Sequence, residues 1–278
     1  MAITKFNEIA VKNNAINLAL GFPDYVVHDV VTKALSNATL DSVINNQYTR
    51  GAGHPRLIKI LSKIYSNLTN HWINPLTDIV ITVGGYEAIF CGISSHVNTA
   101  DEVIIIEPFF ESSIRGSDWI LDPKELRSKF SIKTKMIISN TPNNPIGKIY
   151  TYDELQMIAK LSIEFNTLVL VDEVYEWMIF DHNQHIRMSK ARLLTPLQEA
   201  FAVGYEMEYE RLNQNLSFRK QFARSLQDKR DLIVNMFSEV NTNAVIPEGG
   251  FFLIVDFSNI AKRVNLLQKK ENQTTGNS

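Results

Sequence analysis

Residues 139–176 read SNTPNNPIGKIYTYDELQMIAKLSIEFNTLVLVDEVYE and decide the expected fold. A proline-rich turn is followed by a segment with apolar residues at helical spacing, and then by a short apolar run typical of a buried parallel strand. Thr151 and Glu154 have the spacing of a capping box, which predicts that the helix begins just after Thr151. Asn144 and Asp172 therefore fall at the ends of neighbouring strands, where open α/β sheets bind ligands.

The same alternation of strands and helices extends to both sides of this stretch. Expected helices cover 28–40, 55–69, 122–130 and 151–165, most of 199–240 is helical, and expected strands cover 79–83, 101–108, 133–140 and 167–171. This order predicts an α/β fold with a mostly parallel central sheet between helices. A turn and a further strand are expected within 247–257, before a polar tail.

The composition excludes several classes of protein. Hydrophobic residues make up 45% of the 278 residues and charged residues 21%, with a formal net charge of −2, so nothing indicates a nucleic-acid partner. No apolar run reaches the length of a membrane span, and the N-terminus lacks the pattern of a secretory signal. Cys91 is the only cysteine, which excludes an intramolecular disulfide and fits a reducing compartment. We therefore expect a cytoplasmic protein without a membrane partner.

Three polar residues near the strand ends are candidates for a binding site. A carboxylate that ends an apolar strand, as Asp172 does, needs a cation or several hydrogen-bond donors. It is either a helix cap or surface ion pair, or a partner for a protonated ring nitrogen such as that of pyridoxal 5'-phosphate. Tyr175 and Asn144 are either structural turn residues or hydrogen-bonding groups for the phenolate oxygen of the same ring.

The segment after the expected strand 79–83 offers a second candidate. Gly84 and Gly85 open an expected helix, whose N-terminal amides could meet a phosphate group, although glycines also serve backbone geometry at such a turn. Phe110 could stack on a planar ring or be an ordinary core aromatic residue.

Four segments in this order resemble a known family: TVGGYEAIF (82–90), DEVIIIEPFF (101–110), NTPNNPIGK (140–148) and DEVYEWM (172–178). They are similar to fold-type I aminotransferases that depend on pyridoxal 5'-phosphate, in the kynurenine/glutamine transaminase branch, whose members also act as cysteine-conjugate β-lyases. The resemblance runs from about residue 17 to residue 258. It implies a homodimer that moves an amino group from an amino acid, such as glutamine or kynurenine, to a 2-oxo acid.

The resemblance also implies a role for each matching residue. The implied contacts are Gly85 and Tyr86 with the phosphate, Phe110 stacked on the ring, Asn144 and Tyr175 on the phenolate oxygen, Asp172 on the ring nitrogen, Tyr48 on the cofactor of the partner subunit, and Gly21 beside the substrate. The implied organisation is an N-terminal arm with part of the small domain at 1–45, an internally shortened cofactor-binding domain at 46–210, and a truncated small domain with a polar tail at 211–278.

The chain departs from the family pattern in the catalytic parts. A strand-containing segment is missing between Phe110 and Trp119. After the HIR run at 185–187, the segment that carries the family's Schiff-base lysine is absent, and Lys190 is the only lysine in the shortened stretch. The family's carboxylate-binding arginine has no counterpart either. Arg230 and Arg263 match no such motif, and we expect both on the surface.

We therefore expect a transaminase-family protein, a truncated isoform or the product of a faulty gene model, in which catalysis is impaired. Two alternatives stay open. In the first, Lys190 is recruited as the Schiff-base lysine and the enzyme is active. In the second, the chain is a non-catalytic interaction protein that dimerises with a full-length relative. The family also allows a mitochondrial location, for which no transit peptide is visible in the sequence.

Overall fold

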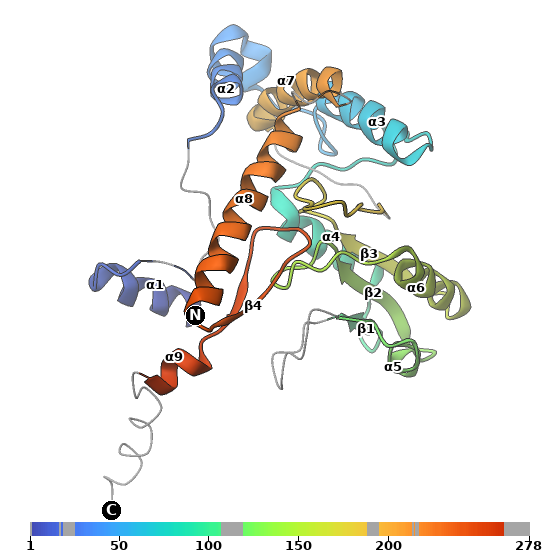
Figure 1. Cartoon of the computed structure of the whole chain (residues 1–278). Coiled ribbons are helices and arrows are strands. Elements are labelled where there is room, and N and C mark those ends of the chain that lie inside the picture. The colour runs from blue at the N-terminus through green and yellow to red at the C-terminus, as the bar shows by residue number, and fades with distance from the viewer. Residues whose placement is uncertain are drawn as a thin grey trace, which may run out of the picture.

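The computed structural model describes residues 2–16, 18, 26–106, 119–187, 195–212, 214 and 217–263. Helices and a small parallel sheet alternate along these residues, as Figure 1 shows. The predicted α/β fold class is confirmed. Within the described part, no helix combines the length and the apolar character needed to cross a membrane.

The sheet contains the strands that the sequence pattern predicted around the opening stretch. Its order is β1 (Glu102–Ile105), β2 (Thr134–Asn140) and β3 (Leu168–Asp172), and both neighbouring pairs are parallel. The register pairs Asn140 with Asp172, so these two strands end at the same level. The carboxyl ends of β2 and β3 therefore present their following turns side by side.

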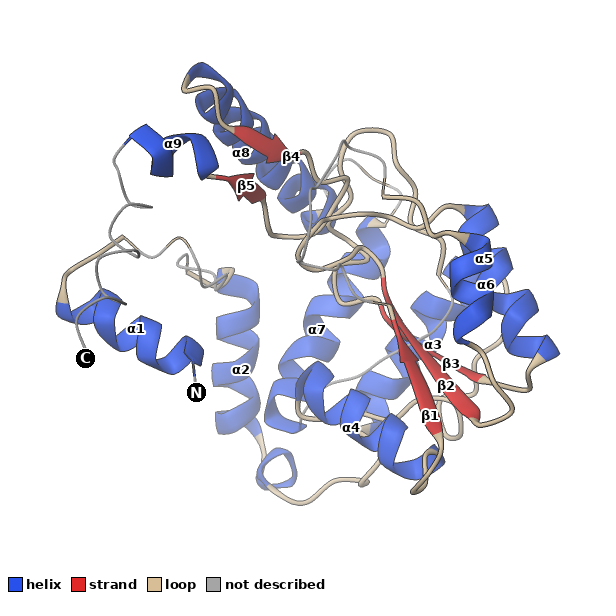
Figure 2. Cartoon of the chain, turned by 90° about the horizontal axis from the view of Figure 1, so that it is seen from below, coloured by secondary structure: helices blue, strands red, loops and turns tan. Residues whose placement is uncertain are grey.

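Helices cover both faces of this sheet (Figure 2). On one face lie α5 (Pro123–Lys129) and α6 (Tyr152–Glu164), which share a core with β2 through Ile137 and Ile158, both fully buried. On the other face α4 (Gly84–His96) packs so closely on β3 that a Cβ at Gly92 would lie 2.8 Å from Leu170 Cδ1. A parallel sheet buried on both sides explains the apolar runs of its strands.

The prediction of a strand at 79–83 is wrong. Ile79 and Ile81 are buried, but they pack in a core with α3 (Pro55–Thr69). The Ile81 amide donates to the Ala52 carbonyl at 3.0 Å, in a loop rather than in a ladder. A strand needs a neighbouring strand to hydrogen-bond, and none of the described residues provides one here.

A helical layer lies beside the sheet. The helix α7 (Thr195–Arg211) packs on α2 (Asp29–Asp41) and on α3, and Ala202 of α7 is fully buried in the α3 core. The helix α1 (Ala2–Lys12) precedes α2 in the chain, and the short helix η1 (Val43–Asn46) follows α2.

The C-terminal part consists of a long helix and a small antiparallel pair. The long helix α8 (Phe218–Glu239) leads to β4 (Asn243–Val245), which pairs with β5 (Ile254–Asp256), and α9 (Ser258–Arg263) follows. Arg263 is exposed as expected. The expectation of a surface position for Arg230 is wrong, because this residue is only 9% exposed and forms ion pairs and a hydrogen bond to the segment around residue 247.

Candidate functional site

The ends of β2 and β3 are tied together by hydrogen bonds to one carbonyl group. The Asp172 carbonyl accepts from the Thr141 amide at 3.0 Å and from Asn140 Nδ2 at 3.0 Å. The Asn144 amide in turn donates to Asn140 Oδ1 at 2.6 Å. The proline turn that follows contains two cis peptide bonds, at Pro142 and Pro145. These contacts hold the exposed Asn144 beside the end of β3.

Asp172 and Tyr175 form the second half of this polar group. Asp172 Oδ1 accepts the Val174 amide at 3.1 Å, which fixes the turn after β3. Burial raises the pKa of the Tyr175 hydroxyl, and the Asp172 charge raises it further. The Asn144 side chain acts as a hydrogen-bonding neighbour and lowers that pKa, and Tyr86 adds a smaller increase. Three other predicted site residues, each from a separate part of the chain, therefore lie within interaction range of Tyr175.

The N-terminus of α4 supplies the glycines. Gly84 has a φ of +81°, which favours glycine, and apart from chain neighbours and the helix's own backbone no described heavy atom lies within 4 Å of the Cβ position at Gly84 or Gly85. This open space in front of a helix N-terminus fits an anionic group. Glu87 already accepts the Val83 amide there, so a bound phosphate would share this helix end with a carboxylate.

Tyr48 lines a groove that borders the start of α4. The groove has a volume of about 670 Å³ and is lined by Arg50, Thr82 and Glu87 among others. The Tyr48 side chain is fully exposed, and Tyr86 is 93% exposed. The expectation that Tyr48 serves a partner subunit stays a prediction.

Three of the predicted residues, Gly21, Phe110 and Lys190, lie outside the described residues. The lysine within the predicted site motif, Lys148, is engaged elsewhere, because its Nζ lies 3.1 Å from Glu154 Oε1.

A buried cluster beside the site escaped the sequence reasoning. The carboxylate of Glu176 accepts the Tyr65 hydroxyl and, at 2.6 Å, Arg187 Nε. The guanidinium groups of Arg187 and Arg219 lie 4.7 Å and 3.8 Å from the centre of the Trp177 ring. Glu176 in DEVYE and Arg187 in HIR carry opposite charges, which is the available sequence signal for their pairing. Tyr65 belongs to α3 and gave no such signal.

The donor set suits the ring of a pyridoxal cofactor. Asp172 offers a carboxylate for a protonated ring nitrogen, and Asn144 and Tyr175 offer an amide and a hydroxyl for a phenolate oxygen. Among the described residues, the glycine turn offers free space for a phosphate, with the carboxylate of Glu87 close to it.

Comparison with solved structures agrees with this fold. YbdL from Escherichia coli, for which a methionine aminotransferase function was identified, superposes with a TM-score of 0.82 over 92% of this chain and 81% of that chain, at 21% identity. Bna3p from Saccharomyces cerevisiae gives a TM-score of 0.80 over 92% of this chain and 76% of that chain, at 25% identity. The fold is that of the fold-type I aminotransferases.

Sequence relatives narrow this class. Residues 116–195 match the family model "Aminotransferase class I and II". Kynurenine–oxoglutarate transaminase 3 of Bos taurus is 34% identical over an alignment that covers 96% of this chain and 74% of the relative. Kynurenine–oxoglutarate transaminase 1 of Homo sapiens is 31% identical, with 94% and 79% covered. The chain belongs to the class I and II aminotransferase family, on the side of the kynurenine–oxoglutarate transaminases.

The alignment with the bovine relative spans 339 residues, more than the 278 residues of this chain. Part of the relative's sequence therefore has no counterpart here, in agreement with the internal gaps noted above.

Proposed function

We propose that this chain is an aminotransferase of the kynurenine–oxoglutarate type that holds pyridoxal 5'-phosphate through non-covalent contacts and transfers amino groups poorly. The observation that carries the proposal is the polar group of Asp172, Asn144 and Tyr175 at the ends of β2 and β3. Members of the family depend on this cofactor and use amino acids and 2-oxo acids as substrates.

Each residue of this group has a role in the proposed site. When bound, the cofactor supplies a ring that absorbs the electrons released at the substrate Cα. The Asp172 carboxylate would keep the ring nitrogen protonated, because an adjacent negative charge favours the cationic form. The Tyr175 hydroxyl, whose pKa is raised by burial, is protonated at neutral pH and can donate to the phenolate oxygen. The side-chain amide of Asn144 would donate to the same oxygen.

The proposed weakness lies in proton transfer. A transaminase needs a base that removes a proton from the substrate Cα and returns it elsewhere, and an amine suits both this task and covalent attachment of the cofactor. Among the described residues of the site motif, Lys148 is paired with Glu154. This leaves Lys190, in the shortened segment, as the candidate, and we rank an active enzyme that uses Lys190 as the alternative.

A spectroscopic experiment separates these possibilities. Purified protein is titrated with pyridoxal 5'-phosphate, treated with borohydride and digested, for the wild type and for Lys190→Ala. We expect saturable binding without a cofactor fixed to the chain. A fixed cofactor in the wild type that disappears in Lys190→Ala would establish the active alternative, and a wild type that binds no cofactor would refute the proposed site.

A matched pair of variants tests the ring contact. Asp172→Asn should weaken cofactor binding on the order of tenfold or more, since a charge-assisted contact to the ring nitrogen is lost. Asp153→Asn, at an exposed position in the first turn of α6, should leave binding unchanged. Equal effects of both variants would contradict the assigned role of Asp172.

We also propose a dimer, either of two copies or with a full-length relative as the non-catalytic alternative requires. The proposed dimer contact is the one that Tyr48 would make with the cofactor of the partner subunit. Large side chains are exposed on this part of the molecule: Val83 is 58% exposed and Phe90 is 69% exposed, in addition to Tyr48 and Tyr86. Such a concentration is typical of an interface. Co-expression followed by size analysis tests it, and monomers alone would exclude both dimers. A cytosolic location remains a proposal, based on the lone cysteine.

A further inference from the structure

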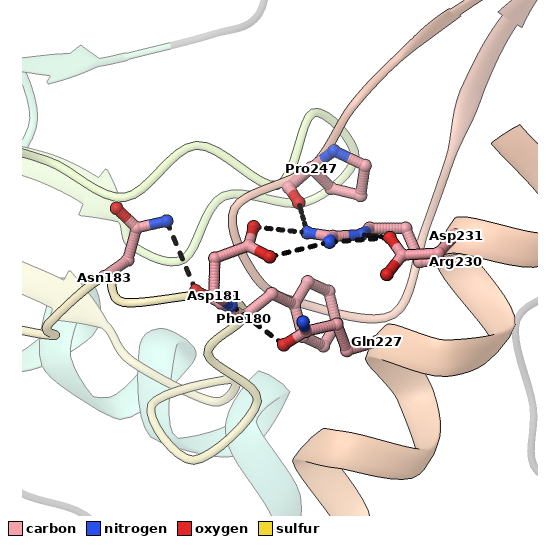
Figure 3. Close-up of polar contacts among 7 residues, drawn as sticks. All are labelled: Phe180, Asp181, Asn183, Gln227, Arg230, Asp231 and Pro247. Atoms are coloured by element: carbon pink, nitrogen blue, oxygen red, sulfur yellow. Dashed lines mark hydrogen bonds and ion pairs between the residues drawn. The ribbon is translucent and has the colours of Figure 1, made fainter.

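Arg230, in the middle of α8, joins three parts of the molecule (Figure 3). Its Nη1 and Nη2 atoms bind the two carboxylate oxygens of Asp181 at 2.8 Å and 2.9 Å. Nη1 also donates to the Pro247 carbonyl at 3.0 Å, and Nε donates to Asp231 at 2.8 Å. The guanidinium is 5.1 Å from the centre of the buried Phe180 ring.

Two of the three partners of Arg230, Asp181 and Pro247, belong to segments that meet at the candidate site. The Asp181 amide donates to Gln227 Oε1 of α8 at 2.9 Å, which adds a second link between α8 and the segment after β3. The Phe180 amide donates to the Glu248 carbonyl at 2.9 Å. Arg230 therefore sits on a junction between α8, residues 178–181 and the turn at 247–252.

This 247–252 turn is bonded to the proline turn of the site. The amides of Glu248 and Gly249 both donate to the Gly147 carbonyl at 3.0 Å, and the Ile149 amide donates to Glu248 Oε2 at 2.9 Å. The Gly250 amide donates to the Met178 carbonyl at 2.8 Å. Each link joins the turn to a segment that begins or ends beside a proposed ring contact.

The backbone segments at this junction are packed too closely to admit a side chain at two of the glycines. A Cβ at Gly147 would lie 2.2 Å from Pro247 Cβ, and a Cβ at Gly249 would lie 2.5 Å from the Met178 carbonyl oxygen. Close-packed backbone of this kind passes on a displacement instead of absorbing it. A shift of Pro247 would thus move the Gly147 turn that carries Asn144.

The far end of the turn contacts the site tyrosine. The Cβ position of Gly250 lies 4.0 Å from Tyr175 Cγ, and the Phe252 ring meets the Tyr175 ring edge-on, with centroids 6.2 Å apart. We infer that Arg230 is a positioning residue of the site: it holds the 247–252 turn in place, and this turn sets the positions of Tyr175 and Asn144. The inference rests on the proposed cofactor site.

The inference predicts a selective effect. Arg230 acts on the side of the site that faces the cofactor ring, whereas the Gly84–Gly85 end of α4 lies outside its junction. In Arg230→Met, binding of pyridoxamine 5'-phosphate should weaken by about tenfold or more, since losing one hydrogen bond to the charged phenolate oxygen corresponds to a change of this size in affinity. Binding of inorganic phosphate, followed by the amide signals of Gly84 and Gly85, should change less than about twofold.

Arg127→Met is the matched control. Arg127 makes a two-point ion pair with Glu164 between α5 and α6, so the variant removes the same type of contact away from the junction. It should change neither affinity, and Arg230→Lys should fall between wild type and Arg230→Met. An equal loss of both ligands in Arg230→Met would indicate a general structural role and overturn the inference, as would no loss of either.

Amide exchange distinguishes this inference from the proposed function. If the wild type binds no pyridoxamine 5'-phosphate, the proposed function fails, and exchange of the Gly249 and Gly250 amides then decides the role of Arg230. Faster exchange in Arg230→Met than in Arg127→Met would support the inference that Arg230 holds the 247–252 turn in place. Equal exchange in the two variants refutes it.

Discussion

The contact between Tyr65 and Glu176 allows a quantitative prediction. The Tyr65 hydroxyl donates to the Glu176 carboxylate, and both residues are buried, at 7% and 8% exposure. Burial raises the pKa of Tyr65 well above its usual value, and the Glu176 charge raises it further, so the hydroxyl remains a donor at all pH values of interest. Tyr65→Phe removes this donor and changes nothing else in volume or shape.

The magnitude follows from what the carboxylate keeps. A hydrogen bond to a charged group contributes about 1.5–3 kcal/mol. Arg187 still holds the other oxygen of Glu176 at 2.6 Å, so the charge stays paired and the larger cost of an isolated buried ion does not arise. We expect a loss of about 2 kcal/mol in the free energy of unfolding, or roughly 3–4 °C in the melting temperature.

Urea unfolding at pH 7, followed by circular dichroism, measures this loss. Tyr152→Phe is the control, because the Tyr152 side chain is 62% exposed and its hydroxyl only accepts from Gln156 at 3.3 Å. The control should stay within about 0.5 kcal/mol of the wild type. Should Tyr65→Phe also stay within that range, the assignment of a strong buried contact to Glu176 is wrong.

Two further predictions concern the core and the pH dependence. Ile137→Ala should cost about 3 kcal/mol in urea unfolding because Ile137 is fully buried, whereas Ile132→Ala at a fully exposed position should cost less than about 0.5 kcal/mol, and equal costs would contradict the placement of β2. The Arg230 hydrogen bonds hold the pKa of Asp181 in the folded protein below its usual value. The ionised carboxylate therefore stabilises the fold at any pH above the pKa of the unfolded state. This contribution is lost as the pH falls through the lower pKa of the folded state. The stability difference between wild type and Asp181→Asn should be constant from about pH 5 to 8 and should shrink below about pH 4; a difference independent of pH would refute the pairing.

Local features of the fold could be predicted from the sequence, because their partners lie a few residues apart. The capping box is present as expected: the Thr151 amide donates to Glu154 Oε2 at 2.9 Å, and the Glu154 amide donates to Thr151 Oγ1 at 3.3 Å. The boundaries predicted for the helix 55–69 are those observed for α3. Ile79 and Ile81 are buried although the strand expected at 79–83 is absent.

Features that depend on distant partners could not be predicted in this way. Whether 79–83 forms a strand depends on a neighbour that the local pattern does not reveal. Arg230 looked like a surface residue because Asp181 lies 49 positions earlier, and nothing in the spacing links the two. In the site, the strand-end positions of Asn144 and Asp172 followed from the order of elements, while the junction around Gly147 depends on backbone hydrogen bonds that carry no sequence signature.

The position of Arg230 along α8 has a mechanical consequence. The helix has 22 residues and a length of about 33 Å, and it crosses the molecule from α7 to the C-terminal strands (Figure 1). Its first residues are held by Glu208, which accepts the Phe218 amide at 3.1 Å, and Gln227 and Arg230 together provide the second support through Asp181. The nine residues of α8 beyond Arg230 extend for about 13 Å. If the helix tilted by about 5° about Arg230, its C-terminal end would move by about 1 Å. Because the Pro247 carbonyl is bonded to Arg230 itself, such a tilt would displace the start of β4 more than Pro247, whose turn contacts Tyr175.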